Sequence, residues 1–172
     1  NIKLVYRPHP WRESNEFPNL SNLKNIVLDP QIENFYKNKK NDFSFNFTPD
    51  LDYYPDLVGG AEFVIGGPTS MMIEAQLIKK KYIVFAHEEN NQKYSPKKWL
   101  NAYNHFSELF LLKNLIIIHN LNELDQKILE LINNETPYEE DGFLNYFIAF
   151  DNESYSQKLT KLIINFINKN VN

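Results

Sequence analysis

Short runs of apolar, β-branched and aromatic residues alternate along the chain with longer segments in which apolar residues recur every three or four positions. Runs of the first kind are typical of buried strands, and the second spacing is typical of helices that cover a sheet. The alternation favours an α/β fold, a Rossmann-like parallel sheet with helices on both faces. Strands are predicted at residues 2–6, 25–28, 62–65, 82–86 and 115–119, and helices at residues 32–40, 53–59, 70–79, 96–109, 121–132 and 153–168.

Residues 1–172 are predicted to form a single domain, because 172 residues with 42% hydrophobic content can bury a substantial core. Residues 42–52 fit either a short strand or an irregular loop. Residues 136–152 are predicted to be a linker, and the amphipathic helix 153–168 is predicted to pack back on the domain. Because the chain begins inside a strand-like run and without an initiator methionine, we expect it to be a piece of a larger protein.

Composition excludes several classes of function. The net charge of −4 and the pI near 5.6 argue against a nucleic-acid partner. The chain has no cysteine, so it has no disulfide, no thiolate metal site and no cysteine nucleophile. No apolar run approaches the roughly 20 residues that a membrane-spanning helix needs, and no signal-peptide pattern is present. These features predict a cytoplasmic setting, with contact at the inner face of a membrane left open.

The turn between the predicted strand 62–65 and the predicted helix 70–79 has the composition of a phosphate-binding turn. Gly66 and Gly67 permit backbone angles closed to other residues and let a ligand approach the main chain, and Pro68 fixes its own angle. Thr69 and Ser70 are expected to cap the helix, with their hydroxyls beside backbone N–H groups at the positive end of the helix dipole. The natural ligand of such a turn is an anion.

Glu74 lies four residues after Ser70 on the same face of the predicted helix. Its carboxylate could accept hydrogen bonds from sugar hydroxyls next to a bound phosphate. The spacing is one residue too long for a capping box with Ser70. An ordinary strand-to-helix turn with a solvated Glu74 accounts for the same residues, so both interpretations stay open.

A second candidate site follows the predicted strand 2–6. The sequence 7–10, Arg-Pro-His-Pro, holds His9 between two prolines that stiffen its backbone. His9 can donate a hydrogen bond to a phosphate oxygen, and Arg7 or Arg12 can add charge-assisted hydrogen bonds. Ligands of parallel α/β sheets bind beyond the carboxyl ends of the strands, a condition that residues 7–12, 29–31 and 66–70 meet. A structural turn with a surface histidine is the alternative.

These two motifs together resemble the nucleotide-sugar-binding, C-terminal half of bacterial GT-B glycosyltransferases, which build surface polysaccharides such as capsule and lipopolysaccharide. A His-Pro motif with a Ser/Thr pair at a helix start is similar to the motifs of enzymes that use CMP-sugars, namely bacterial sialyltransferases and Kdo transferases. It is also somewhat similar to the motifs of glycerophosphotransferases of teichoic acid synthesis. The resemblance covers most of the chain and is carried by short motifs.

The resemblance implies that His9 contacts the donor phosphate, that Thr69 and Ser70 bind the same phosphate, and that Glu74 contacts the ribose. His9 and Arg7 would then stabilise the negative charge on the departing phosphate while the sugar passes to an acceptor hydroxyl. It also implies that an N-terminal domain, absent from this piece, binds the glycan acceptor and supplies the general base. This piece is therefore predicted to bind its donor without turning it over. The predicted donor site is completed by Arg12, Gly66, Gly67 and Pro68.

No metal or other cofactor is required by that scheme. Residues 50–52, Asp-Leu-Asp, have the spacing of a metal-binding pair, but they precede a predicted helix and are predicted to form a capping turn. Residues 139–142, Glu-Glu-Asp-Gly, are similar to the acidic motif that supplies the base in some sialyltransferases, but their position predicts a solvated loop. His105 and His119 are predicted to be structural, and position alone places His87 near the donor, with Glu88 or Glu89 near its sugar.

Two other functions stay open on the sequence. One is a phosphotransferase that uses a CDP-linked polyol, in which His9 and Ser70 would have comparable phosphate roles. The other is a non-catalytic α/β module that binds a phosphorylated ligand or a partner protein. The donor sugar, its base, the acceptor and the stereochemical outcome are not determined by these residues.

Overall fold

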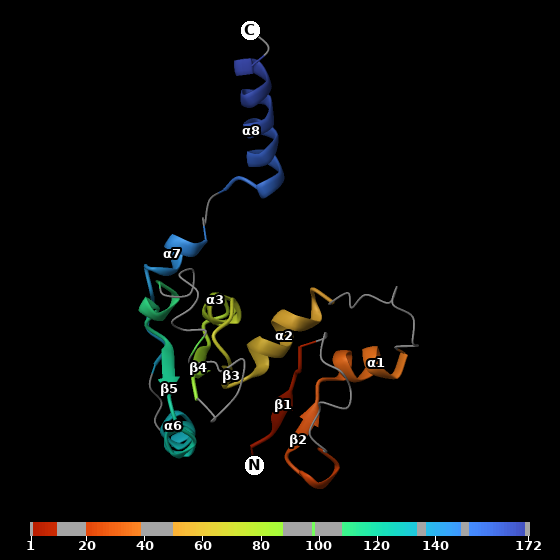
Figure 1. The fold of residues 1–172 in the computed structure, drawn as a ribbon, viewed down its shortest axis with the longest axis vertical. Helices are drawn as coiled ribbons and strands as arrows, with labels where there is room; N and C mark the ends of the chain where they lie inside the picture. Colours follow the sequence, from red (N-terminus) through yellow and green to blue (C-terminus); the bar gives the residue numbers. More distant parts are fainter. Residues whose placement is uncertain are drawn as a thin grey trace. The chain divides into compact units, whose positions relative to one another are not determined.

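The computed structural model describes residues 2–9, 20–38, 50–87, 98, 108–133, 137–148 and 152–170. The chain divides into two compact units, Asn1–Leu57 and Val58–Asn172, and each is described by itself. Both are built from parallel strands and helices (Figure 1), so the predicted α/β, Rossmann-like class is confirmed. The prediction of one domain over residues 1–172 stays a prediction.

The first unit contains a two-stranded parallel sheet. β1 (Leu4–Tyr6) pairs with β2 (Ile26–Leu28), with Leu4 opposite Ile26 and Tyr6 opposite Leu28. A 3-10 turn, η2 (Leu20–Asn22), precedes β2, and the helix α1 (Pro30–Asn38) follows it. The helix α2 (Tyr53–Gly60) carries the chain from the first unit into the second.

The start of α1 is fixed by Asp29. Its Oδ1 accepts a hydrogen bond from the backbone N–H of Ile32 at 3.0 Å, which is the geometry of a helix N-cap. Pro30 occupies the first helical position, where its missing N–H costs nothing. The pair Asp-Pro therefore starts the helix at residue 30, two residues before the predicted start.

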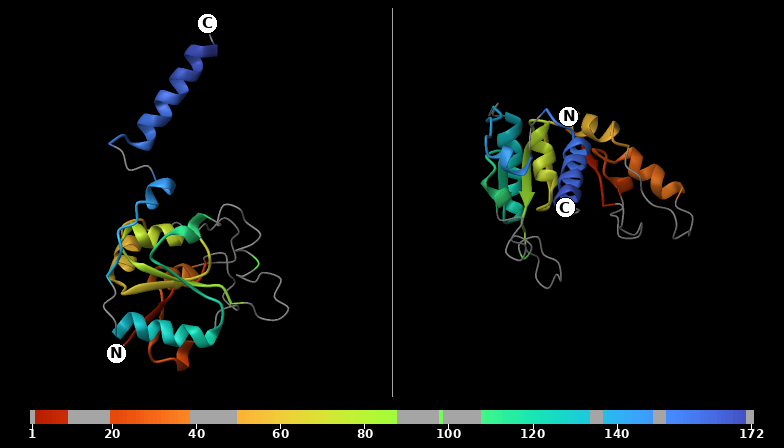
Figure 2. Two further views of the ribbon diagram at one scale, coloured as in Figure 1. Left: turned by 90° about the vertical axis from the view of Figure 1, so that its left-hand side faces the viewer. Right: turned by 90° about the horizontal axis from the view of Figure 1, so that it is seen from above.

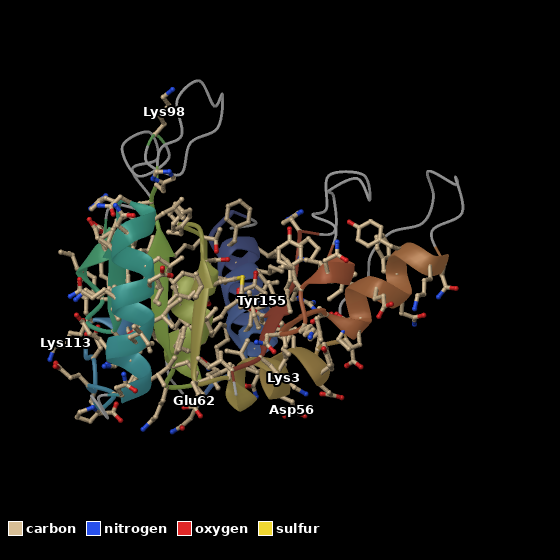
Figure 3. All side chains as sticks on the ribbon, turned by 90° about the horizontal axis from the view of Figure 1, so that it is seen from below. Lys3, Asp56, Glu62, Lys98, Lys113 and Tyr155 are labelled. Atoms are coloured by element: carbon tan, nitrogen blue, oxygen red, sulfur yellow. The ribbon has the colours of Figure 1, made fainter. Side chains whose placement is uncertain are left out.

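The second unit contains a three-stranded parallel sheet in the order β3-β4-β5. Its strands are β3 (Phe63–Gly66), β4 (Lys81–Phe85) and β5 (Leu115–Ile118). Glu62 and Lys113 lie at the edge where these strands begin (Figure 3), opposite the edge that carries the β3–α3 turn. The helical elements are α3 (Met71–Leu77), η3 (Glu108–Leu111), α6 (Leu121–Asn133), α7 (Leu144–Phe147) and α8 (Tyr155–Asn170).

Helices cover both faces of this sheet, α3 on one and α6 on the other (Figure 2). Because side chains of a strand alternate between faces, Tyr82 and Val84 of β4 point to the α3 side and Phe85 to the α6 side. The principal core forms on the α3 side. Its buried members are Met72, Ala75, Tyr82, Val84, Leu109, Leu112 and Leu144.

The C-terminus of α3 is closed by a lysine in the left-handed region. Lys79 has φ of 56°, and the N–H of Lys80 donates to the carbonyl of Ala75 at 2.8 Å, as in a Schellman motif. The helix ends at Leu77, two residues before the predicted end at residue 79. The side chain of Lys79 also pairs with Glu140 at 2.6 Å.

All five predicted strands are present, each within two residues of its predicted bounds. The short helix α7 was not predicted. The predicted helix 96–109 and the segment 42–52 lie mostly outside the described residues. The apolar side chains of α8 are exposed, with Leu162 at 68% and Phe166 at 69%. The structure therefore does not show the predicted packing of the last helix on the domain, which stays a prediction.

Candidate functional site

Two of the predicted ligand loops follow strands at the carboxyl edge of their own parallel sheet. Residues 7–9 follow β1 in the first unit, and residues 67–70 follow β3 in the second. This is the edge at which α/β sheets bind ligands. The other predicted loop, residues 29–31, follows β2 and contributes the start of α1.

The β3–α3 turn does not need its glycines for unusual backbone angles. It needs one of them for close packing. None of the five glycines of the chain has a positive φ, so the turn does not use the backbone freedom that Gly66 and Gly67 permit. A Cβ on Gly66 would lie 2.1 Å from the hydroxyl oxygen of Tyr82, whereas a Cβ on Gly67 would meet nothing within 4 Å. Gly66 is therefore required because the ring of Tyr82 passes beneath it.

Tyr82 binds the backbone of the turn from the core side of the sheet. It is fully buried, and its hydroxyl donates to the backbone carbonyl of Gly67 at 2.9 Å. Burial raises the pKa of Tyr82 to about 12, so the hydroxyl keeps its proton at neutral pH and remains a donor. Sequence reasoning missed this residue. Its only signal in the sequence was a tyrosine at the second position of β4, the strand next to β3.

The two hydroxyl residues of the turn have different roles. The Oγ1 of Thr69 accepts a hydrogen bond from the N–H of Met71 at 3.3 Å, so Thr69 caps α3 as predicted. Ser70 is exposed and its side chain makes no capping hydrogen bond, contrary to the expected cap. Among the described residues, the backbone N–H groups of Thr69 and Ser70 have no acceptor. The turn therefore carries one exposed hydroxyl, at Ser70, and two backbone N–H donors that have no acceptor in the described part of the chain.

Pro68 lies just before these donors in the chain, and Glu74 lies one helical turn after them. Pro68 is fully buried, which fixes the path of the turn between Gly67 and Thr69. Glu74 is half-buried one turn into α3, where its carboxylate adds to the pKa rise of Tyr82 that burial begins. The predicted strand–turn–helix unit is present, with Gly66 at the end of β3, Pro68 and Ser70 in the turn and Glu74 in α3.

An apolar cavity of about 430 Å³ opens on the α6 side of the same edge. It is open to solvent over much of its extent, so it is a shallow depression of the surface and not an enclosed pocket. Its lining consists almost entirely of carbon and hydrogen surface, and it includes both glycines of the turn. The lining residues are Ile65, Gly66, Gly67, Phe85, Leu121 and Leu124.

His87 lies next to this edge, directly after β4. Its Nδ1 is 3.2 Å from the backbone carbonyl oxygen of His119, which follows β5. His119 itself is exposed, and its N–H donates to the carboxylate of Glu123 at 3.1 Å, so it belongs to the start of α6. The predicted neighbours Glu88 and Glu89, and His105, lie outside the described residues.

In the first unit, the guanidinium of Arg7 is held by neighbouring side chains. It donates from Nη1 to Asp29 and from Nη2 to Gln31, both at 2.8 Å, and it lies 5.2 Å from the ring centre of Tyr54. Asp29 is fully buried and also accepts a hydrogen bond from Tyr53 at 3.2 Å. Arg7 therefore neutralises a buried carboxylate. The role of Arg7 at a phosphate stays a prediction. A bound phosphate would have to share the guanidinium with Asp29 and Gln31.

His9 is exposed and follows the buried Pro8. Arg12, and Pro10 on the far side of the histidine, lie outside the described residues. The predicted role of His9 at the donor phosphate therefore rests on the sequence motif.

The two acidic motifs have structural roles. The Oδ1 of Asp50 accepts hydrogen bonds from the N–H groups of Asp52 and Tyr53, so the predicted capping turn is confirmed. The carboxylate of Asp141 accepts from the N–H groups of Lys113 and Phe143 at 2.7 and 2.9 Å. Residues 139–141 thus tie the segment before α7 to the start of β5. Within the described ranges, no group of three or more His, Asp or Glu side chains is placed to hold a metal.

Comparison of the chain with protein-family models, with curated proteins and with solved structures found no match.

The contact between Gly66 and Tyr82 predicts a pair of coupled substitutions. Gly66→Ala should lower the free energy of unfolding by roughly 1 to 3 kcal/mol, because the new methyl group overlaps the tyrosine hydroxyl. Tyr82→Phe removes that oxygen and leaves the ring carbon at 3.1 Å. The double variant should therefore be roughly 1 to 2 kcal/mol more stable than the sum of the single effects, measured by urea denaturation. Gly67→Ala is the matched control and should change stability by less than about 0.5 kcal/mol. Strict additivity would contradict the contact.

The raised pKa of Tyr82 predicts a loss of stability in alkali. The unfolded chain ionises this tyrosine near its ordinary pKa of 10, whereas the folded chain does so near 12. Between these values the unfolded state binds fewer protons, so the free energy of unfolding falls as pH rises, by roughly 2 to 3 kcal/mol in all. Tyr82→Phe should flatten this part of the stability curve. Tyr155→Phe, at an exposed ring, should leave it unchanged, and equal curves for wild type and Tyr82→Phe would refute the assignment.

Proposed function

We propose that this chain is the donor-binding part of a bacterial glycosyltransferase of the GT-B type, and that it binds a nucleotide-sugar, with a CMP-sugar favoured. The observation that carries the proposal is the β3–α3 turn, where an exposed serine hydroxyl and two backbone N–H groups without an acceptor among the described residues lie at the carboxyl edge of a parallel sheet. Such a group of donors suits a phosphate, which offers several acceptor oxygens. In this proposal Ser70 and Thr69 hold the donor phosphate.

The surroundings of the turn support a nucleotide over a simple phosphate. Glu74 stands one helical turn beyond Ser70 and can accept hydrogen bonds from ribose hydroxyls. On the other side of Gly67, the apolar cavity beside Phe85 can receive a flat or apolar part of a ligand. A ligand that carries a charged centre, a hydroxylated ring and a flat base would use all three features.

The proposed chemistry is transfer of the sugar from the phosphate to an acceptor hydroxyl. The bond between the anomeric carbon and the phosphate oxygen breaks, a new bond to the acceptor oxygen forms, and the acceptor proton goes to a base. Negative charge increases on the departing phosphate, and donors that are already in place at Thr69 and Ser70 would stabilise it without reorganising. His9 is proposed, from its motif, as a further donor to this phosphate.

Calorimetric titration with CMP, CDP, UDP and GDP tests the proposal. One nucleotide should bind, and Ser70→Ala should weaken that binding by roughly 1.5 to 3 kcal/mol, the range for a hydrogen bond to a charged group. His9→Ala should weaken the same nucleotide if its motif contributes to the site. A preference for CDP over CMP would favour the phosphotransferase alternative.

Ser156→Ala is the matched control, because it removes another exposed serine hydroxyl far along the sequence from the turn. It should bind the nucleotide like the wild-type chain. The proposal fails if no nucleotide binds at millimolar concentration, or if Ser70→Ala binds as tightly as the control.

A further inference from the structure

The helix α8 has an apolar face that is open to solvent. The positions of this face follow one another at intervals of three and four residues, so they share one side of the helix. Figure 3 labels Tyr155, which lies in the first turn of α8 and is 79% exposed. Ile164 is apolar too but lies off this side. The face consists of Tyr155, Leu159, Leu162, Ile163, Phe166 and Ile167, which are between 42% and 79% exposed.

The charge of α8 has the opposite sign to that of the chain. Residues 155–170 contain three lysines and no acidic residue, while the whole chain carries a net charge of −4. Lys158 lies one turn before Leu162, and Lys169 lies just under one turn after Phe166, so both border the apolar face. Lys161 pairs with Glu153, just before the helix. The polar remainder consists of serine, threonine, glutamine and asparagine side chains.

The length of α8 limits how it could meet a lipid bilayer. Sixteen helical residues extend about 24 Å, less than the roughly 30 Å of a hydrocarbon core. None of the helices in the described part of the chain is long and apolar enough to cross a membrane. A helix of this kind, with bordering lysines and mixed aliphatic and aromatic side chains, instead suits a position parallel to the membrane plane.

We propose that α8 binds the surface of an anionic lipid bilayer, with its apolar face at the boundary of headgroups and acyl chains. The lysines that border this face would contact anionic headgroups, and their aliphatic stems would lie along the boundary. A second copy of α8 is the competing occupant of this face, and the experiments below distinguish it from a bilayer. This inference is independent of the nucleotide site, and either can fail without the other.

Flotation of the whole chain with lipid vesicles tests the inference. The chain should float with vesicles of 70% phosphatidylcholine and 30% phosphatidylglycerol, and should bind pure phosphatidylcholine at least about tenfold more weakly, because the lysines lose their anionic partners. The triple variant K158Q, K161Q and K169Q should lose roughly 30-fold or more of its partitioning into the anionic vesicles. Ile163→Gln with Phe166→Gln should lose at least roughly tenfold, because two apolar side chains no longer enter the lipid.

Asn165→Gln, on the polar side of α8, is the matched control and should float like the wild-type chain. Circular dichroism should show unchanged helix content in all variants, since the substituted side chains are exposed except for the half-buried Lys158. Light scattering after gel filtration decides between the occupants. A monomer that floats only with anionic vesicles supports the inference. Two results overturn it: a wild-type dimer that becomes a monomer in the Ile163→Gln, Phe166→Gln variant, or a wild-type monomer that binds no vesicles.

Discussion

The hydrogen bond from the Tyr82 hydroxyl to the Gly67 carbonyl is the interaction on which the candidate site depends. A buried tyrosine from the middle strand reaches beneath the end of β3, and the chain can turn above it only because residue 66 has no side chain. The Gly67 carbonyl is bound by Tyr82 on the core side, and Pro68 is buried. The residues that follow, Thr69 and Ser70, are therefore directed away from the core. The solvent-facing position of Ser70 is thus a consequence of core packing in β4.

Because of this constraint, one turn can contribute to the surfaces on both faces of the sheet. Val64 and Tyr82 lie on the α3 side, where the core is densest, while Ile65 and Phe85 lie on the α6 side and line the apolar cavity. The turn stands between these faces, with polar donors at Ser70 and carbon surface at Gly67. Polar and apolar parts of one ligand could therefore be bound at a single strand end, which is the basis of the proposed nucleotide-sugar function.

The strands and most helices could be predicted because apolar periodicity is a local signal. The cap at Asp29-Pro30 is local too, but it was not recognised, so α1 begins two residues before its predicted start. The capping role of Asp50 was also local and was predicted correctly. The role of Gly66 was not, because it depends on a tyrosine sixteen residues later that only the strand register brings beneath it. The partners of Arg7 were missed for the same reason, since Asp29 becomes its neighbour through the pairing of β1 with β2. Sequence patterns identified the segment that carries the candidate site, but not which side chains are already engaged.

The central claim is that the turn after β3 binds the phosphate of a nucleotide. The most direct measurement is a titration of the isotopically labelled chain with CMP, followed through the backbone amide signals in NMR spectra. The account predicts that the largest shift changes occur at the amides of Thr69 and Ser70, and that those of Ile163 in α8 stay unchanged. Saturable changes that leave Thr69 and Ser70 unmoved, or no changes at any concentration of CMP, CDP, UDP or GDP, would contradict it.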